Sequence, residues 1–148
     1  IGNESDYMLC LGTKFQAVGK QEELSPVEHF RETVKQVKKI FPETTVFATN
    51  IREVQSADRH LWGCVMQNGK DFEFVEPKEI AIIDRIGGGD GFVGGLLYSI
   101  IKGFTPDEQI HFAWASGVLA STFLTDYAQP DDEQQIWDIW NRNTRIKR

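Results

Sequence analysis

The sequence has few cysteines, no long apolar run and no excess of basic charge. Its two cysteines, Cys10 and Cys64, are far apart, which excludes a disulfide framework and a zinc pattern. They favour two buried thiols in a reducing, cytoplasmic compartment. No stretch approaches the roughly 20 apolar residues that cross a bilayer, so we expect no membrane partner. The net charge of -6 argues against nucleic acid as a partner, because phosphate backbones select basic surfaces.

The chain also lacks an initiator methionine, and its first residues, IGNESDY, become polar almost at once. Such a start is not typical of a signal peptide. Ile1-Gly2 resembles the last step of a strand, so we expect the C-terminal part of a longer protein. A length of 148 residues, 41% of them hydrophobic, suits one compact domain or part of a larger one.

Helix and strand signals alternate along the chain, which predicts an α/β fold with a mainly open sheet. Strands are expected at residues 44–50 and 79–84, and Asn68-Gly69 between two apolar segments predicts an antiparallel hairpin. Helices are expected, besides the one discussed next, at residues 5–11, from Ser25 to about Phe41, from Thr105 to about Phe123, and at residues 131–143.

The most informative segment is DRIGGGDGFVGGLLY, residues 84–98, in which three glycines separate a predicted strand from a predicted helix. The start of a helix has unpaired N–H groups, and glycines let a phosphate approach them closely. Gly87, Gly88 and Gly89 therefore predict an anion hole that the amide of Asp90 would complete. The Asp90 carboxylate suits a base that takes a proton from an attacking hydroxyl. The alternative is a glycine-rich turn followed by an ordinary aspartate, which the helix dipole favours by itself.

The segment IDRIGGGDGFVGGLLY resembles the C-terminal signature of the ribokinase-like (PfkB) sugar kinases, Asp-Thr-x-Gly-Ala-Gly-Asp-x-Phe. Its DRxGGGD form is most similar to the 2-keto-3-deoxygluconate (KDG) kinase branch. IGNESD is similar to the family's Asn-x-x-Glu segment, and ASGVLASTFLTDYAQPDDE resembles its last conserved block. The resemblance covers nearly all 148 residues. It implies that residues 1–148 are the C-terminal part of a three-layer α/β/α fold, with a mainly parallel sheet plus the hairpin.

The same resemblance implies an ATP-dependent sugar-acid kinase that phosphorylates KDG on its terminal hydroxyl, with ATP and Mg²⁺. Asp90 would be the catalytic base, and Asp126 would contact the sugar acid. The residues near cations would be Asn3 and Asp6 for magnesium, with Asp6 one methylene shorter than the family's glutamate, and Asp84 for a monovalent cation. Arg85 replaces the threonine that usually follows Asp84.

A polar segment, NIREVQSADRHLWGC, is similar to the loop that leads to the nucleotide in this branch. The residues that would line the ATP groove are Thr49, Arg52, Ser56 and Arg59 of this loop, together with Trp114. A solvated loop with surface ion pairs is the alternative for the loop, and a place in the core is the alternative for Trp114.

Two further alternatives for the function stay open. The first is another PfkB sugar kinase, of the fructokinase or ribokinase type, because most sugar-contacting residues of the family precede the part that this chain resembles. The second is a nucleotide-binding fragment without catalysis. Homo-oligomers in the family often form through the lid in that preceding part, so an oligomer is an expectation that depends on it.

Overall fold

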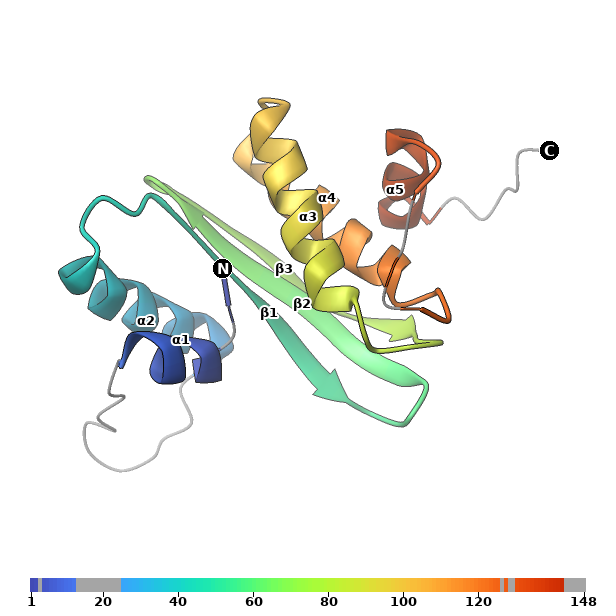
Figure 1. The fold of residues 1–148 in the computed structure, drawn as a ribbon, viewed down its shortest axis with the longest axis horizontal. Coiled ribbons are helices and arrows are strands. Elements are labelled where there is room, and N and C mark those ends of the chain that lie inside the picture. The colour runs from blue at the N-terminus through green and yellow to red at the C-terminus, as the bar shows by residue number, and fades with distance from the viewer. Residues whose placement is uncertain (3, 13–24, 126, 128–129, 143–148) are drawn as a thin grey trace.

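The computed structural model describes residues 1–2, 4–12, 25–125, 127 and 130–142. These residues form three layers, in which two helices cover one face of a sheet and three helices lie over the other (Figure 1). The elements, in chain order, are α1 (Glu4–Leu11), α2 (Pro26–Ile40), β1 (Val46–Val54), β2 (Arg59–Asn68), β3 (Asp71–Ala81), α3 (Gly88–Ile101), α4 (Pro106–Ala120) and α5 (Glu133–Trp140). The expected α/β/α layering is therefore present in the described part of the chain.

The sheet differs from the expected one. Its three strands follow the order β1-β2-β3, and both pairs are antiparallel, so the prediction of a mainly parallel sheet is wrong for the described residues. The cause is the length of the connections. Parallel neighbours need a crossover of a dozen or more residues, whereas residues 55–58 and 69–70 are tight hairpin turns. Gly69 has a φ of 60°, as the predicted Asn68-Gly69 turn requires.

Two strand boundaries also differ from the predicted ones. The strand predicted at residues 79–84 is instead the end of β3, since Glu79 and Ile80 continue the pairing with Leu61 and His60 of β2. The strand predicted at residues 44–50 extends to Val54. The segment predicted as a polar loop is therefore mostly the β1–β2 hairpin.

Two of the predicted helix starts are confirmed in detail. Ser25 caps α2 and Thr105 caps α4, and each accepts a hydrogen bond from the N–H group of a glutamate three residues later. The carboxylates of Glu28 and Glu108 in turn accept from the two capping residues. These capping boxes fix where both helices leave the preceding turns.

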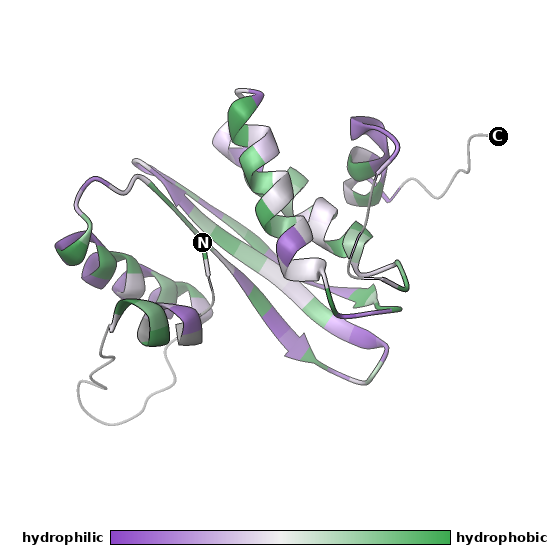
Figure 2. Cartoon of the chain, in the orientation of Figure 1, coloured by the Kyte–Doolittle hydropathy of each residue, from purple (hydrophilic) through white to green (hydrophobic). Residues whose placement is uncertain are grey.

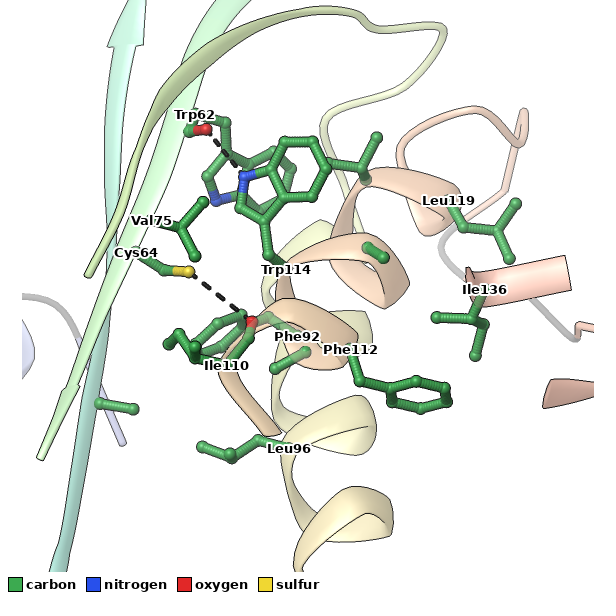
Figure 3. Packing of buried hydrophobic residues seen from close by; sticks show 14 of the residues in the cluster. Trp62, Cys64, Val75, Phe92, Leu96, Ile110, Phe112, Trp114, Leu119 and Ile136 are labelled. Atoms are coloured by element: carbon green, nitrogen blue, oxygen red, sulfur yellow. Dashed lines mark hydrogen bonds between the residues drawn. The ribbon is translucent and has the colours of Figure 1, made fainter. Parts of the chain in front are cut away.

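A separate apolar cluster lies on each face of the sheet. On the α3 side, the buried residues include Trp62, Phe92 and Leu96, together with Trp114, whose Nε1–H donates to the carbonyl of Trp62 at 2.8 Å (Figure 3). On the other side, the cluster joins α1 and α2 to Phe47 and Val65. Figure 2 shows the result for the helices: α2 alternates between hydrophilic and hydrophobic positions, whereas α3 has few strongly hydrophilic ones.

Of the helices in the described part, none has the length and apolar character that a membrane span requires.

Candidate functional site

The candidate site is the turn from β3 into α3. Gly87 is the N-cap and has a φ of 81°, a left-handed conformation that glycine adopts without steric cost. The first helical hydrogen bond runs from the N–H of Gly91 to the carbonyl of Gly87 at 2.8 Å, and no side chain of the described residues caps the helix. The N–H groups of Gly88, Gly89 and Asp90 therefore have no partner within the helix. This is the geometry of an anion hole at a helix N-terminus.

The structural reason for a glycine differs among the three positions of the turn. At Gly88, a Cβ would lie 2.7 Å from Cη2 of Trp62 and 2.7 Å from Oγ of Ser121, so packing leaves no room for a side chain. At Gly89, a Cβ would meet nothing within 4 Å. The fold requires glycine at position 87 because of the left-handed backbone, and at position 88 because neighbouring side chains leave no space. It does not explain Gly89, which faces open space where a ligand could approach.

Neighbouring backbone holds this turn against α4. The N–H groups of Ile83 and Asp84 both donate to the carbonyl of Ser121, at 2.9 and 3.2 Å. A carboxylate oxygen of Asp84 accepts from the N–H of Ile86 at 2.9 Å. The carboxylate predicted to bind a monovalent cation therefore has a structural partner, and cation binding by Asp84 stays a prediction.

Asp90 is the third residue of α3 and is exposed. Within the described residues, its carboxylate has neither a hydrogen bond nor an ion pair with another side chain. It borders a cavity of about 500 Å³ between α3, α4 and α5, whose lining includes Gly94, Tyr98, Ser116 and Glu133. At one point of this lining, Tyr98 donates to a carboxylate oxygen of Glu133 at 2.9 Å. A free carboxylate at a cavity, next to unpaired N–H groups, suits proton transfer beside a bound anion.

The residues predicted to line a nucleotide groove separate in the structure, because most of them belong to strands and not to a loop. Side chains alternate between the faces of a strand. Arg52 lies on the α3 face, with its guanidinium carbon 6.0 Å from the centroid of the Trp62 ring. Thr49 is on the opposite face of β1, where it lines a small cavity with Tyr7 of α1 and Pro26 of α2.

Ser56 and Arg59 lie at the β1–β2 turn and have local partners. The hydroxyl of Ser56 donates to a carboxylate oxygen of Asp58 at 2.8 Å, and Arg59 pairs with Glu79 at 2.8 Å. These contacts favour the alternative interpretation of this segment, in which its side chains make surface ion pairs and hydrogen bonds with each other. Trp114 is 5% exposed and packs in the core, so its burial favours the core alternative over contact with adenine.

One buried polar side chain on the α3 side of the sheet, His60, was not predicted from the sequence. His60 is 2% exposed, and its Nδ1 is the only buried side-chain nitrogen or oxygen without a hydrogen-bond partner among the described residues. Burial lowers the pKa of His60, and the positive charges of Arg52 and Arg85 lower it further. The signal that could have found His60 is its spacing of two residues from Trp62, which places both side chains on one face of β2.

The predicted cation and substrate residues are not assembled here. Asn3 and Asp126 lie outside the described residues. Asp6 is on α1, in the helical layer across the sheet from α3 (Figure 1). In the part of the chain that the structure describes, no three His, Cys, Asp or Glu side chains gather as metal ligands would.

The fold and the turn together define a class: an α/β/α protein with a candidate anion site between a strand and a glycine-rich helix. Comparisons with protein-family models and with curated proteins give no match. Among solved structures, the chain is similar to 2-dehydro-3-deoxygluconokinase from Thermotoga maritima, with a TM-score of 0.79 and 25% identity. That match covers 93% of this chain and 39% of the other.

Two more solved structures agree. A PfkB family carbohydrate kinase from Listeria grayi matches with a TM-score of 0.72 and 24% identity, over 94% of this chain and 39% of its own. A proposed 2-keto-3-deoxygluconate kinase from Enterococcus faecalis matches with a TM-score of 0.76 and 21% identity, over 99% and 41%. The chain therefore has the fold of part of a PfkB carbohydrate kinase, and it spans about two-fifths of the length of these structures.

Proposed function

We propose that the chain is the nucleotide-binding and catalytic part of an ATP-dependent sugar-acid kinase that phosphorylates KDG on its terminal hydroxyl. The start of α3 carries the proposal, because three N–H groups and the carboxylate of Asp90, all without a partner among the described residues, lie within one helical turn. The N–H groups suit a phosphoryl group that gains charge, and the carboxylate suits a base. The likeness in fold to KDG kinases supports the choice of substrate.

In the proposed reaction, the terminal hydroxyl oxygen of the sugar acid attacks the γ-phosphorus of ATP. A new P–O bond forms while the bond to the bridging oxygen breaks, and that oxygen leaves with the electron pair as part of ADP. Asp90 takes the proton of the hydroxyl. The N–H groups of Gly88, Gly89 and Asp90 donate to oxygens of the transferred group, where negative charge accumulates.

Magnesium, when bound with ATP, would supply positive charge that neutralises the phosphates in such a transfer. The described residues do not fit a protein-held magnesium site, since no group of three ligands is present and Asp6 lies across the sheet from α3. The steps above therefore depend on the turn and on Asp90, and none is assigned to the metal.

The test measures ADP release by the complete product of the gene, with MgATP and a panel of KDG, gluconate, fructose and ribose. An Asp90→Asn variant is measured beside it. Asp107→Asn is the matched control, because Asp107 also lies in the first turn of a helix but pairs with His111 at 3.2 Å, away from the glycine turn. We expect KDG-dependent turnover that falls by at least about 10³-fold with Asp90→Asn and little with Asp107→Asn.

Each outcome decides a different part of the proposal. Turnover on fructose or ribose alone would retain the mechanism and exclude KDG as the substrate. Full activity of Asp90→Asn on KDG would exclude Asp90 as the base. The absence of turnover on every sugar, with ATP still bound, would mean that the turn is a binding feature.

A nucleotide-binding fragment without catalysis is the second candidate, and one observation favours it. The chain spans only 39–41% of the kinase structures that it matches, so the greater part of those proteins has no counterpart in it. This candidate predicts that the 148-residue chain binds ATP, and that Asp90→Asn changes nothing catalytic because no sugar is turned over with either residue.

A further inference from the structure

The last residue of α5, Trp140, contacts two basic side chains of the neighbouring elements. Nζ of Lys78, on β3, lies 3.5 Å from the centroid of the Trp140 ring. The imidazole of His111, on α4, stacks on the same ring, with centroids 3.9 Å apart and an angle of 18° between the planes. Trp114 adds an edge contact, with ring centroids 5.5 Å apart. Trp140 is therefore the point at which α5 is attached to both β3 and α4.

The ammonium of Lys78 has aromatic rings where a carboxylate would be the ordinary partner. Its side chain is partly buried, and burial lowers its pKa, which the charge of Arg142 lowers further. Within the described residues, Lys78 forms no ion pair, and its second ring contact is with Trp114 at 5.2 Å. The face of a tryptophan ring attracts a cation through its quadrupole. Lys78 therefore loses its nearest partner whenever Trp140 moves away.

The helix α5 is too short to be stable without contacts of this kind. It has eight residues, and isolated helices of fewer than about 12 residues are marginal in water. Its other anchors include Ile136, which is buried in the core, and Glu133, which accepts a hydrogen bond from Tyr98 of α3 at 2.9 Å. The stability of α5 is therefore set by its docking onto α3, α4 and β3.

The same helix forms one wall of the cavity that Asp90 borders. Glu133 and Ile136 line this cavity from α5, together with Gly94 of α3 and Ser116 of α4. Because the cavity lies between three helices, release of α5 would open it to solvent. The contacts of Trp140 therefore bear on access to Asp90.

A positive charge on His111 would oppose the docking of α5. Docking covers the ring with Trp140 and brings it close to the ammonium of Lys78, which contacts the same indole. Burial lowers the pKa of His111, Asp107 at 3.2 Å raises it in part, and Lys78 lowers it. Asp107 lies on α4 with His111, so their pair can persist when α5 is released. The other acidic group on this side is Glu73 of β3, whose pKa burial raises and Asp107 raises further.

We propose that α5 is a lid over the cavity beside Asp90, which the contacts of Lys78 and His111 with Trp140 hold closed and which protonation of His111 releases. Docking should weaken as the pH falls below about 6.5, the ordinary pKa of histidine, because the ring binds a proton more readily once α5 has left. At pH 5.5 the docking equilibrium would be weaker by at most about tenfold, since the released ring is then about 90% protonated.

Hydrogen–deuterium exchange of the 148-residue chain measures this docking as the protection of residues 133–140, with α4 as the internal reference. Between pH 7.5 and 5.5, we expect the protection of α5 relative to α4 to fall by about three- to tenfold. His111→Gln, which cannot take up the proton, should remove this fall. Lys78→Met should lower the protection of α5 at pH 7.5 by roughly threefold. The matched control is Lys38→Met, because Lys38 also lies over a ring, 5.5 Å from the centroid of Phe47 on the opposite face of the sheet.

Chemical labelling tests whether α5 closes the cavity. In a Cys10→Ser background, which removes the exposed thiol, Ser116→Cys places a new thiol in the cavity lining. Iodoacetamide modifies that thiol at a rate that depends on its access to solvent. At pH 7.5, we expect Lys78→Met to speed the modification about threefold, in proportion to the released fraction of α5, and Lys38→Met to leave it unchanged. Unchanged protection of α4 shows that each variant retains the fold.

Four results would overturn the inference. They are equal relative protection of α5 at the two pH values, the same fall with pH in His111→Gln, a labelling rate that Lys78→Met leaves unchanged, and stronger protection at the lower pH. The last result would mean that a protonated His111 stabilises the stack with Trp140. Neither measurement uses a nucleotide or a sugar, so the lid and the proposed kinase reaction can each fail without the other.

Discussion

Gly89 and Gly94 offer a test that separates phosphate binding from helix stability. Both lie in α3, and at both an added Cβ meets nothing within 4 Å. Neither has the positive φ that favours glycine. Glycine in a helix costs about 1 kcal/mol relative to alanine. Considered as parts of the fold only, both positions should accept alanine.

The expected magnitudes differ by position. Gly94→Ala lies in the helix interior and should raise the free energy of unfolding by about 0.5–1 kcal/mol. Gly94 borders the same cavity as Asp90 but lies beyond the first turn and its unpaired N–H groups, so phosphate binding there should not change. Gly89 is the second residue of α3, where less helical structure depends on it, so the stability should change by less than about 0.5 kcal/mol. Its methyl group would occupy space beside the unpaired N–H groups. We expect at least a tenfold loss of affinity for ATP, about 1.4 kcal/mol.

Urea unfolding gives the stabilities, and calorimetric titration of the 148-residue chain with ATP and tripolyphosphate gives the affinities. Wild-type affinity of Gly89→Ala for ATP and tripolyphosphate would refute the anion hole, because a methyl group next to these N–H groups would obstruct a phosphate that they bind. An equal loss in Gly94→Ala would assign the effect to the helix as a whole and not to the turn.

The remaining predictions concern the neighbours of the turn. Gly88→Ala should lower the free energy of unfolding by about 1–3 kcal/mol in urea unfolding, because its Cβ would lie 2.7 Å from the Trp62 ring; wild-type stability would show that the ring can move away. Trp114→Phe should cost about 1–3 kcal/mol through the lost 2.8 Å hydrogen bond to the carbonyl of Trp62, with ATP affinity unchanged; weaker ATP binding at equal stability would restore the adenine interpretation. The lowered pKa of His60 means that the unfolded chain binds more protons, so stability should fall as pH drops through about 6.5, and less so in His60→Gln. Identical pH profiles of the two proteins would contradict this.

The features that sequence could predict are those that depend on nearby residues. Ser25 and Thr105 cap helices through residues three positions away, and Asn68-Gly69 closes a hairpin between adjacent strands. The left-handed conformation of Gly87 likewise belongs to the start of α3 alone. In each case the physical cause lies within one short segment, so the pattern of residue types contains it.

The features that sequence could not predict depend on strand register. A segment of apolar residues at 79–84 is equally compatible with a separate parallel strand and with the end of β3, and pairing with Leu61 and His60 decides between them. The interpretation of residues 50–64 as a loop also missed the alternation of faces along the strands, which places Arg52 on the side of α3 and Thr49 on the side of α2. The spacing of His60 from Trp62 indicates which face of β2 it occupies, but its burial depends on the strands that pair with β2 on both sides.

The charge balance at the turn depends on Asp90. A polyphosphate at the start of α3 would lie close to the carboxylate of Asp90, and like charges a few ångströms apart repel by on the order of a few kcal/mol at an effective dielectric constant of about 20. The helix N-terminus supplies only about half a unit of positive charge, too little to offset this repulsion by itself. It follows that Asp90→Asn, which removes the repulsion and leaves the donors, should bind tripolyphosphate more tightly than the wild type even as catalysis is lost. Weaker binding by that variant in the same calorimetric titration would mean that Asp90 helps to hold the anion and that this charge balance is wrong.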